Sequence, residues 1–184
     1  MAHELKENME GVEYLVEYCL NRLKMLLDYE VTPIFVFDGA EHPMKIKTEK
    51  KREKNRKRIN EAAQKLLEEG KSKEAMKKFN EGANITPKHA KALILALQEL
   101  KIEYYVAPYE ADAQLAYLSL IGKVDFVITE DSDLLPFGTD VVFMKMDKTG
   151  KGYEIRLDKL RHCEEMNLQS FDFSAFLSAC IMTG

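Results

Sequence analysis

Three groups of carboxylates each follow a short run of β-forming apolar residues. The runs and their acids are Ile34–Phe37 with Asp38, Tyr104–Val106 with Glu110 and Asp112, and Phe126–Thr129 with Asp131 and Asp133. If these runs are parallel strands of one sheet, their carboxyl ends meet at one edge, where open α/β folds place ligands. Five acids in one crevice repel one another unless a cation neutralises them, and oxygen-only ligands favour Mg²⁺ or Mn²⁺. This pattern indicates a metal-dependent phosphodiester nuclease.

Such chemistry can use two metal ions. Hydrolysis of a phosphodiester places charge on the attacking and leaving oxygens, and two metal ions roughly 3.5–4 Å apart stabilise both. One ion generates a hydroxide-like nucleophile from water, and the other supports the leaving oxygen. We assign Asp38, Glu110 and Asp112 to one ion. We assign Asp112, Asp131 and Asp133 to the other.

Each acidic group taken alone has a simpler explanation. Asp38 stands before a glycine, which is common turn chemistry. Glu110 and Asp112 complement the dipole at the start of a helix. Asp131 and Asp133 suit a solvated loop with a helix cap. Turn chemistry does not readily explain acids at three strand ends together, so the joint arrangement favours the metal site.

A strongly basic segment follows the first acid. Residues 45–58 hold nine basic and two acidic residues, a net of +7, so the rest of the chain carries −11 to give the overall −4. Lys45, Arg52 and Arg56 fall within about 40° of one another on a helix. We predict that these three grip the scissile phosphate and assist its activation, while Lys51 and its basic neighbours attract the backbone. A solvated face or a nuclear-import patch is the alternative.

Strand and helix patterns alternate, which predicts an α/β fold with a mainly parallel sheet. Helices are expected at 12–27, 86–100, 111–121 and 173–182, with a charged helical region over 44–81 broken near Gly70 and Gly82, and a β-hairpin over 141–156. No apolar run approaches the roughly 18 residues that cross a bilayer. The scattered cysteines, Cys19, Cys163 and Cys180, predict reduced thiols in the cytosol or nucleus.

Three blocks, residues 35–39, 107–118 and 128–135, resemble the structure-specific 5′-nuclease superfamily, which includes flap endonuclease and eukaryotic exonuclease 1. The resemblance covers nearly the whole chain, and its details favour exonuclease 1. It implies a PIN-like fold with mainly parallel sheet, a core over 1–43 and 83–184, and a helical arch inserted at about 44–82. It also implies that the three acidic groups bind two Mg²⁺ ions, for which Mn²⁺ can substitute, and that the residues matching Lys45, Arg52 and Arg56 engage the 5′ end.

The activity implied by this resemblance is 5′→3′ exodeoxyribonuclease and 5′-flap endonuclease cleavage. The implied substrates are DNA with free 5′ ends, flaps, nicks or gaps. The implied setting is mismatch repair and recombination in the nucleus, with mismatch-repair proteins as partners and no membrane.

The chain also departs from the family pattern. Family members begin with a segment that holds the mature amino-terminal glycine, followed by a first strand with another catalytic aspartate. They continue past the equivalent of Gly184 into a further metal-site aspartate and a helix–two-turn–helix clamp. We therefore expect a single, partial nuclease domain over 1–184, with strands left unpaired next to the missing one. The alternative is a catalytically incomplete fragment that acts only as a DNA-binding or partner-binding module.

Overall fold

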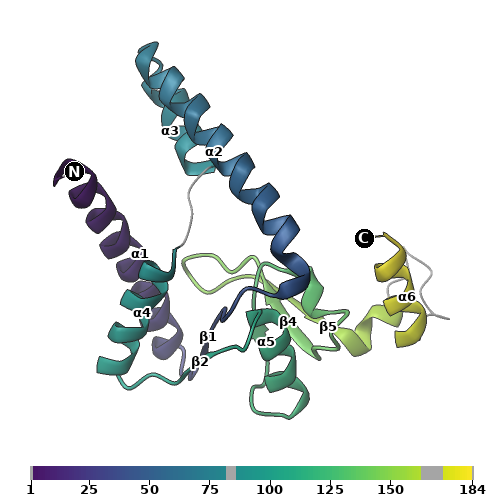
Figure 1. Cartoon of the computed structure of the whole chain (residues 1–184). Helices are drawn as coiled ribbons and strands as arrows, with labels where there is room; N and C mark the ends of the chain where they lie inside the picture. The colour runs from purple at the N-terminus through teal and green to yellow at the C-terminus, as the bar shows by residue number, and fades with distance from the viewer. Residues whose placement is uncertain (1, 82–85, 163–171, 184) are drawn as a thin grey trace. The chain divides into compact units, whose positions relative to one another are not determined.

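The computed structural model describes residues 2–81, 86–162 and 172–183. It divides into two compact units, one formed by residues 1–16 and 40–96 and the other by residues 17–39 and 97–184. The helices are α1 (Ala2–Asp28), α2 (Ile46–Glu68), α3 (Ser72–Glu81), α4 (Pro87–Glu99), α5 (Ala111–Leu120) and α6 (Phe173–Thr183), as labelled in Figure 1. Helix α1 crosses the boundary between the units. The strands belong to the second unit.

The strands form two separate ladders rather than one sheet. Strand β1 (Phe35–Phe37) pairs in parallel with β2 (Tyr104–Val106). Strand β3 (Val127–Ile128) pairs in parallel with β4 (Val141–Met144), which forms the predicted antiparallel hairpin with β5 (Tyr153–Arg156). In the described part of the chain no ladder joins β1 or β2 to β3, so the expectation of one continuous sheet is wrong. The expected α/β class with mainly parallel pairing is confirmed.

Helix α5 connects the two ladders. It contacts both β1 and β3, as well as the short 3₁₀ helix η2 (Ser132–Leu134) that follows β3. Ala116 of α5 packs with Val127, Leu134 and Val142 in the buried core of this unit. Burial of these apolar side chains supplies the main stabilising free energy here, because strands of two to four residues contribute few ladder hydrogen bonds. The ends of β1 and β3 are therefore positioned largely by packing on α5.

The helices end in tight left-handed turns that direct the chain into the strands. After α1, Glu30 has a φ of 61° and the Val31 N–H donates to the Leu26 carbonyl. After α4, Lys101 has a φ of 57° and the Ile102 N–H donates to Leu97. These are Schellman motifs, in which glycine is the usual left-handed residue. Both turns reverse the chain just before β1 and β2, so they set where those strands begin.

In the first unit, α3 folds back along α2 (Figure 1). The break between them is at Gly70, as predicted, where a φ of 77° closes the end of α2. Small residues on the facing sides, Ala63 and Ala75, are buried completely or nearly so. Their size lets the two helices approach closely, while the charged side chains of α2 remain largely at the surface.

Two of the three cysteines lie among the described residues. Cys19 and Cys180 are free, and partial burial raises the pKa of Cys19. Cys163 lies outside the described residues. Among the described helices, none is both long enough and apolar enough to cross a membrane.

Candidate functional site

The five predicted acids occupy the segments that follow three strands. Asp38 comes directly after β1, Glu110 is the N-cap residue of α5 a few positions after β2, and Asp112 lies in the first turn of α5. Asp131 and Asp133 lie in the turn after β3, where Asp131 is the N-cap residue of η2. All five belong to the second unit. The local sequence thus places each acid where a strand gives way to a helix.

Backbone contacts tie the end of β1 to the start of α5. The Oδ1 atom of Asp38 accepts a hydrogen bond from the Ala111 N–H at 2.8 Å, so Asp38 lies beside the residue between Glu110 and Asp112. The Gly39 N–H donates to the Tyr109 carbonyl at 2.6 Å. This hydrogen bond holds the segment after β1 against the segment after β2, directly beside Asp38.

Gly39 permits this close approach. A Cβ atom at this position would lie 1.8 Å from the Ala107 carbonyl oxygen, which is far inside van der Waals contact. The sequence pattern led us to treat this glycine as turn chemistry, and its role as a packing contact between segments was missed. Nothing in the local sequence signals that role, because the contacting carbonyl lies 68 residues further along the chain.

The second acidic turn is held by its own side chains. The Asp131 Oδ1 atom accepts a hydrogen bond from the Asp133 N–H at 2.9 Å, and the Asp131 N–H donates to Thr129 Oγ1 at 3.0 Å. The loop-and-cap explanation considered for these acids therefore describes real contacts. It does not exclude metal ligation, because an ionised carboxylate has two oxygens and about four acceptor positions.

The charges of the five acids converge on Asp112. Its pKa is raised from the usual value, first by partial burial and then by the negative charges of the other four acids, Asp131, Asp38, Glu110 and Asp133. Each of the four acts on the same carboxyl group, so the ends of the three strands share one electrostatic environment. A cluster of this kind carries excess negative charge that a bound cation neutralises.

The donor set fits a hard divalent cation, because every ligand offered is a carboxylate oxygen. The spacing is wider than that of a formed site. Across the described residues, no three histidine, cysteine, aspartate or glutamate side chains stand close enough together to enclose a metal ion.

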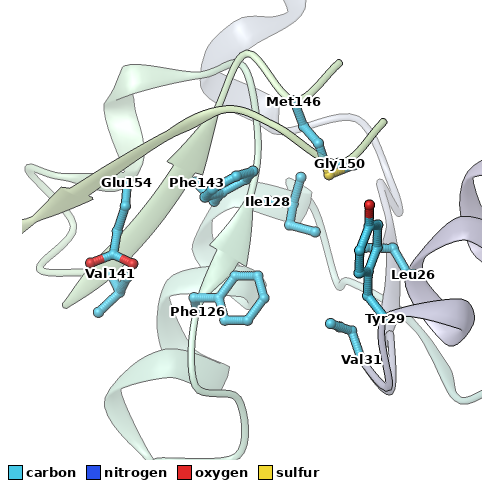
Figure 2. A pocket seen from close by; sticks show the side chains of 10 residues that line it. All are labelled: Leu26, Tyr29, Val31, Phe126, Ile128, Val141, Phe143, Met146, Gly150 and Glu154. Carbon is cyan, nitrogen blue, oxygen red and sulfur yellow. The ribbon is translucent and has the colours of Figure 1, made fainter. Parts of the chain in front are cut away.

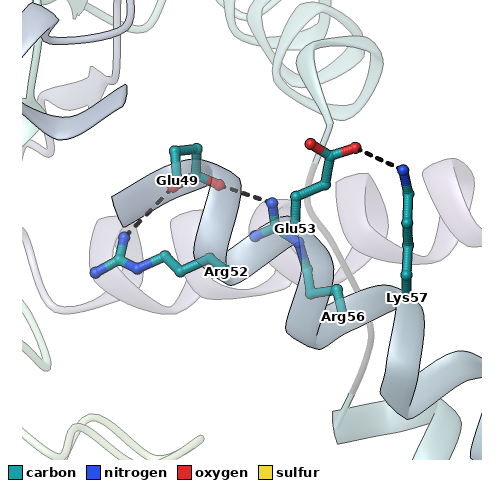
Figure 3. Close-up of polar contacts among 5 residues, drawn as sticks. All are labelled: Glu49, Arg52, Glu53, Arg56 and Lys57. Carbon is teal, nitrogen blue, oxygen red and sulfur yellow. Dashed lines mark hydrogen bonds and ion pairs between the residues drawn. The ribbon is translucent and has the colours of Figure 1, made fainter. Parts of the chain in front are cut away.

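The predicted phosphate contacts lie in the first unit. Arg52 and Arg56 are on α2, and both lie near Glu49, at 3.7 and 2.7 Å (Figure 3). Lys51, the other predicted backbone contact on this helix, is exposed. Lys45 lies outside α2, because Pro43 begins a separate 3₁₀ turn, η1 (Pro43–Lys45), and α2 starts one residue later. Lys45 is the N-cap residue of α2 and has right-handed helical backbone angles, φ −98° and ψ −1°, so its alignment with the two arginines stays a prediction.

A pocket in the second unit lies away from this chemistry. Apolar side chains, including Tyr29, Phe126, Phe143 and Met146, line it (Figure 2). None of the five predicted acids is among its described lining residues, and Glu154 is the one carboxylate there. An apolar pocket with one acid offers no polyvalent cation site, so we place the candidate site at the strand ends instead.

Comparison with protein families matches most of the chain. The XPG N-terminal domain matches residues 1–59, and the XPG I-region matches residues 101–184. The second match includes four of the five acids, and the first includes Asp38 together with Lys45, Arg52 and Arg56.

Exonuclease 1 from Oryza sativa subsp. japonica is 45% identical over 169 residues, which cover 92% of this chain and 20% of that protein. Exodeoxyribonuclease 1 from Schizosaccharomyces pombe is 44% identical over 168 residues, covering 91% of this chain and 29% of that protein. The chain thus spans less than a third of the length of these two relatives.

Among solved structures, the catalytic core of Rad2 in complex with a DNA substrate has a similar fold. The TM-score is 0.52 at 27% sequence identity, with 78% of this chain and 40% of the Rad2 chain covered. The similarity in fold agrees with the α/β arrangement described above.

Proposed function

Because this chain belongs to the XPG family of structure-specific 5′ nucleases, we propose that it forms the acidic centre of a divalent-metal-dependent nuclease acting on DNA. The observation that supports the proposal is the raised pKa of Asp112, on which the charges of four other acids from the ends of three strands act, together with the hydrogen bond from the Ala111 N–H to Asp38. The names of the relatives, exonuclease 1 and exodeoxyribonuclease 1, support hydrolysis from a DNA end. The substrates proposed are free 5′ ends, 5′ flaps, nicks and gaps.

Each acid has a defined part in this proposal. Asp38, Glu110 and Asp112 would hold one Mg²⁺ ion, and Asp112, Asp131 and Asp133 would hold a second, with Mn²⁺ as a substitute. When bound, such ions supply a hydroxide-like nucleophile and neutralise charge on the leaving oxygen. The chain itself orients the ligands, since the Ala111 N–H fixes one oxygen of Asp38 and the Asp133 N–H fixes one oxygen of Asp131.

The basic helix has a complementary part. Arg52 and Arg56 donate N–H groups to non-bridging oxygens of the nucleic-acid backbone, and Lys45 and Lys51 add positive charge. Guanidinium groups suit this role because their planar N–H donors match two phosphate oxygens at once. The two functions, binding and hydrolysis, thus belong to different segments of the chain.

The biological setting is also a proposal. 5′→3′ exodeoxyribonuclease and 5′-flap endonuclease cleavage suit mismatch repair and recombination in the nucleus, with mismatch-repair proteins as partners. Its support is family membership together with the names of the relatives.

The test of the metal-ligand assignment is Asp131→Asn, assayed on a 5′-labelled DNA duplex with Mg²⁺. We expect cleavage to fall by at least about 100-fold, because the amide removes a charged ligand, while DNA affinity stays unchanged. Asp140→Asn is the matched control, since Asp140 is an exposed aspartate outside the cluster. Retained cleavage by Asp131→Asn contradicts the assignment.

A second function, DNA binding without cleavage, is favoured by one observation. No three potential ligands among the described residues are close enough to form a ready metal site, whereas residues 45–58 carry a net charge of +7. A pure binding module loses about 10³-fold in affinity between 50 and 200 mM salt if about six phosphates are contacted. It shows this steep loss without any metal-dependent cleavage. A flat salt response contradicts both functions.

A further inference from the structure

One acidic side chain on α2 lies between the two arginines proposed to bind phosphate. The Nη2 atom of Arg56 donates to Glu49 Oε1 at 2.7 Å, and Arg52 Nη1 lies 3.7 Å from Glu49 Oε2 (Figure 3). Arg52 is three positions after Glu49 and Arg56 is seven positions after it, so the three side chains lie along one side of the helix. A single carboxylate therefore holds two guanidinium groups.

The two contacts differ in strength. The Arg56 contact has the length of a charge-assisted hydrogen bond, and the Arg56 side chain is 29% exposed against 65% for Arg52. Ion pairs that are less exposed to solvent are screened less by salt. Glu49 therefore neutralises Arg56 more strongly, while Arg52 remains open to solvent.

A phosphate oxygen and a carboxylate oxygen accept hydrogen bonds from the same guanidinium N–H groups. Glu49 lowers the combined charge of the group from +2 to +1, and it occupies a donor of Arg56. A nucleic-acid strand that binds these arginines has to displace Glu49 or share the donors with it.

We propose that Glu49 is an internal competitor for the phosphate-binding groups of Arg52 and Arg56, and that it limits how tightly α2 holds a nucleic-acid backbone. This inference rests on the proposed function, since it takes α2 as a nucleic-acid-binding element. Weaker binding favours movement of α2 along the nucleic-acid strand between cleavage events. An arginine that releases a phosphate can pair with Glu49 instead.

The test compares Glu49→Gln with Glu53→Gln in the full chain. Each change removes one negative charge from α2 and keeps the side-chain shape, but the ion pair of Glu53 is with Lys57, at 3.1 Å, and Arg56 is the weakest of the charges that act on Glu53. The affinity for a fluorescein-labelled DNA duplex with a 5′ flap is measured by anisotropy from 50 to 200 mM KCl. EDTA is present so that the DNA stays intact.

We expect Glu49→Gln to tighten binding about threefold more than Glu53→Gln does at 50 mM salt. The slope of log affinity against log salt concentration becomes steeper by about one unit in Glu49→Gln, because one further phosphate contact is made. In an Arg52→Gln, Arg56→Gln background, Glu49→Gln has no larger effect than Glu53→Gln. Circular dichroism of each variant verifies that the helical content is unchanged.

Two results overturn the inference while leaving DNA binding in place. Equal tightening by both variants assigns the effect to general charge, and weaker binding by Glu49→Gln makes this residue a positioning group for the arginines. A failure of the unaltered chain to bind DNA is a different result, because it overturns the proposed function along with the inference.

Discussion

The acidic centre and the basic helix are built in opposite ways. The acids come from three segments separated by about 70 and 20 residues, and tertiary contacts bring them together, such as the hydrogen bond from Ala111 to Asp38. The cations of α2 are neighbours along one helix, and its regular turn alone places Arg52 and Arg56 on one side. A site assembled across segments depends on the whole fold, whereas a site on one helix depends on that helix.

The acidic centre and the basic helix also differ in their electrostatics. In the acidic centre like charges face one another, and the pKa of Asp112 is raised. On α2 opposite charges face one another in two ion pairs, Glu49 with Arg56 and Glu53 with Lys57, while residues 45–58 keep a net charge of +7. The first region therefore carries repulsion between like charges, while the second carries excess positive charge that two internal ion pairs reduce only in part.

The largest effect is expected from Gly39→Ala, which breaks the acidic region alone. The new Cβ would meet the Ala107 carbonyl oxygen at 1.8 Å, so the backbone beside Asp38 has to shift. We expect the free energy of unfolding to fall by about 3 kcal/mol. Urea denaturation measures the change.

Gly122→Ala is the control for this substitution. Alanine is strained at the left-handed φ of 68° found there, but its Cβ meets nothing within 4 Å. Its expected cost is about 1 kcal/mol. A Gly39→Ala cost no larger than that of Gly122→Ala shows that the approach of the two segments does not position the site.

A smaller effect, confined to the basic region, is expected from Arg52→Gln combined with Arg56→Gln. DNA affinity falls about tenfold at low salt, and the salt slope becomes shallower by about one unit, because Glu49 already competes for one of the two arginine contacts. Binding titrations measure both quantities. Lys57→Gln serves as the single-charge control. An unchanged salt slope in the double variant removes the arginines from the interface.

The smallest effect is expected in the pH dependence of stability, and it concerns the acidic region. The pKa of Asp112 is raised above its usual 3.8, so the folded chain binds this proton more tightly than the unfolded chain does. Asp112 therefore stabilises the folded chain below pH 3.8, and this stabilisation is lost as the pH rises through the raised pKa. In EDTA, we expect the free energy of unfolding of the unaltered chain to decrease relative to that of Asp112→Asn across this range. An increase contradicts the shared acidic environment.

Patterns in the sequence predicted much of the fold because they are local. The helices expected at 12–27 and 86–100, the break near Gly70 and the β-hairpin over 141–156 all lie where periodicity and turn chemistry place them. The acids were also found from local pattern, since each follows a β-forming run.

What the sequence could not predict depends on contacts between distant segments. A single mainly parallel sheet was expected from the strand pattern, yet the described strands form two ladders, and β1 and β3 both pack on α5. The role of Gly39 depends on a carbonyl far along the chain.

The most direct test of the central claim is cleavage of a 5′-labelled DNA duplex with a recessed end by this chain, with Mg²⁺ and with EDTA. The account predicts that labelled nucleotides are released with Mg²⁺ and that EDTA abolishes the release, because the five clustered acids require a divalent cation to act. Absence of cleavage by a protein shown to be folded, or equal cleavage in EDTA, contradicts the account.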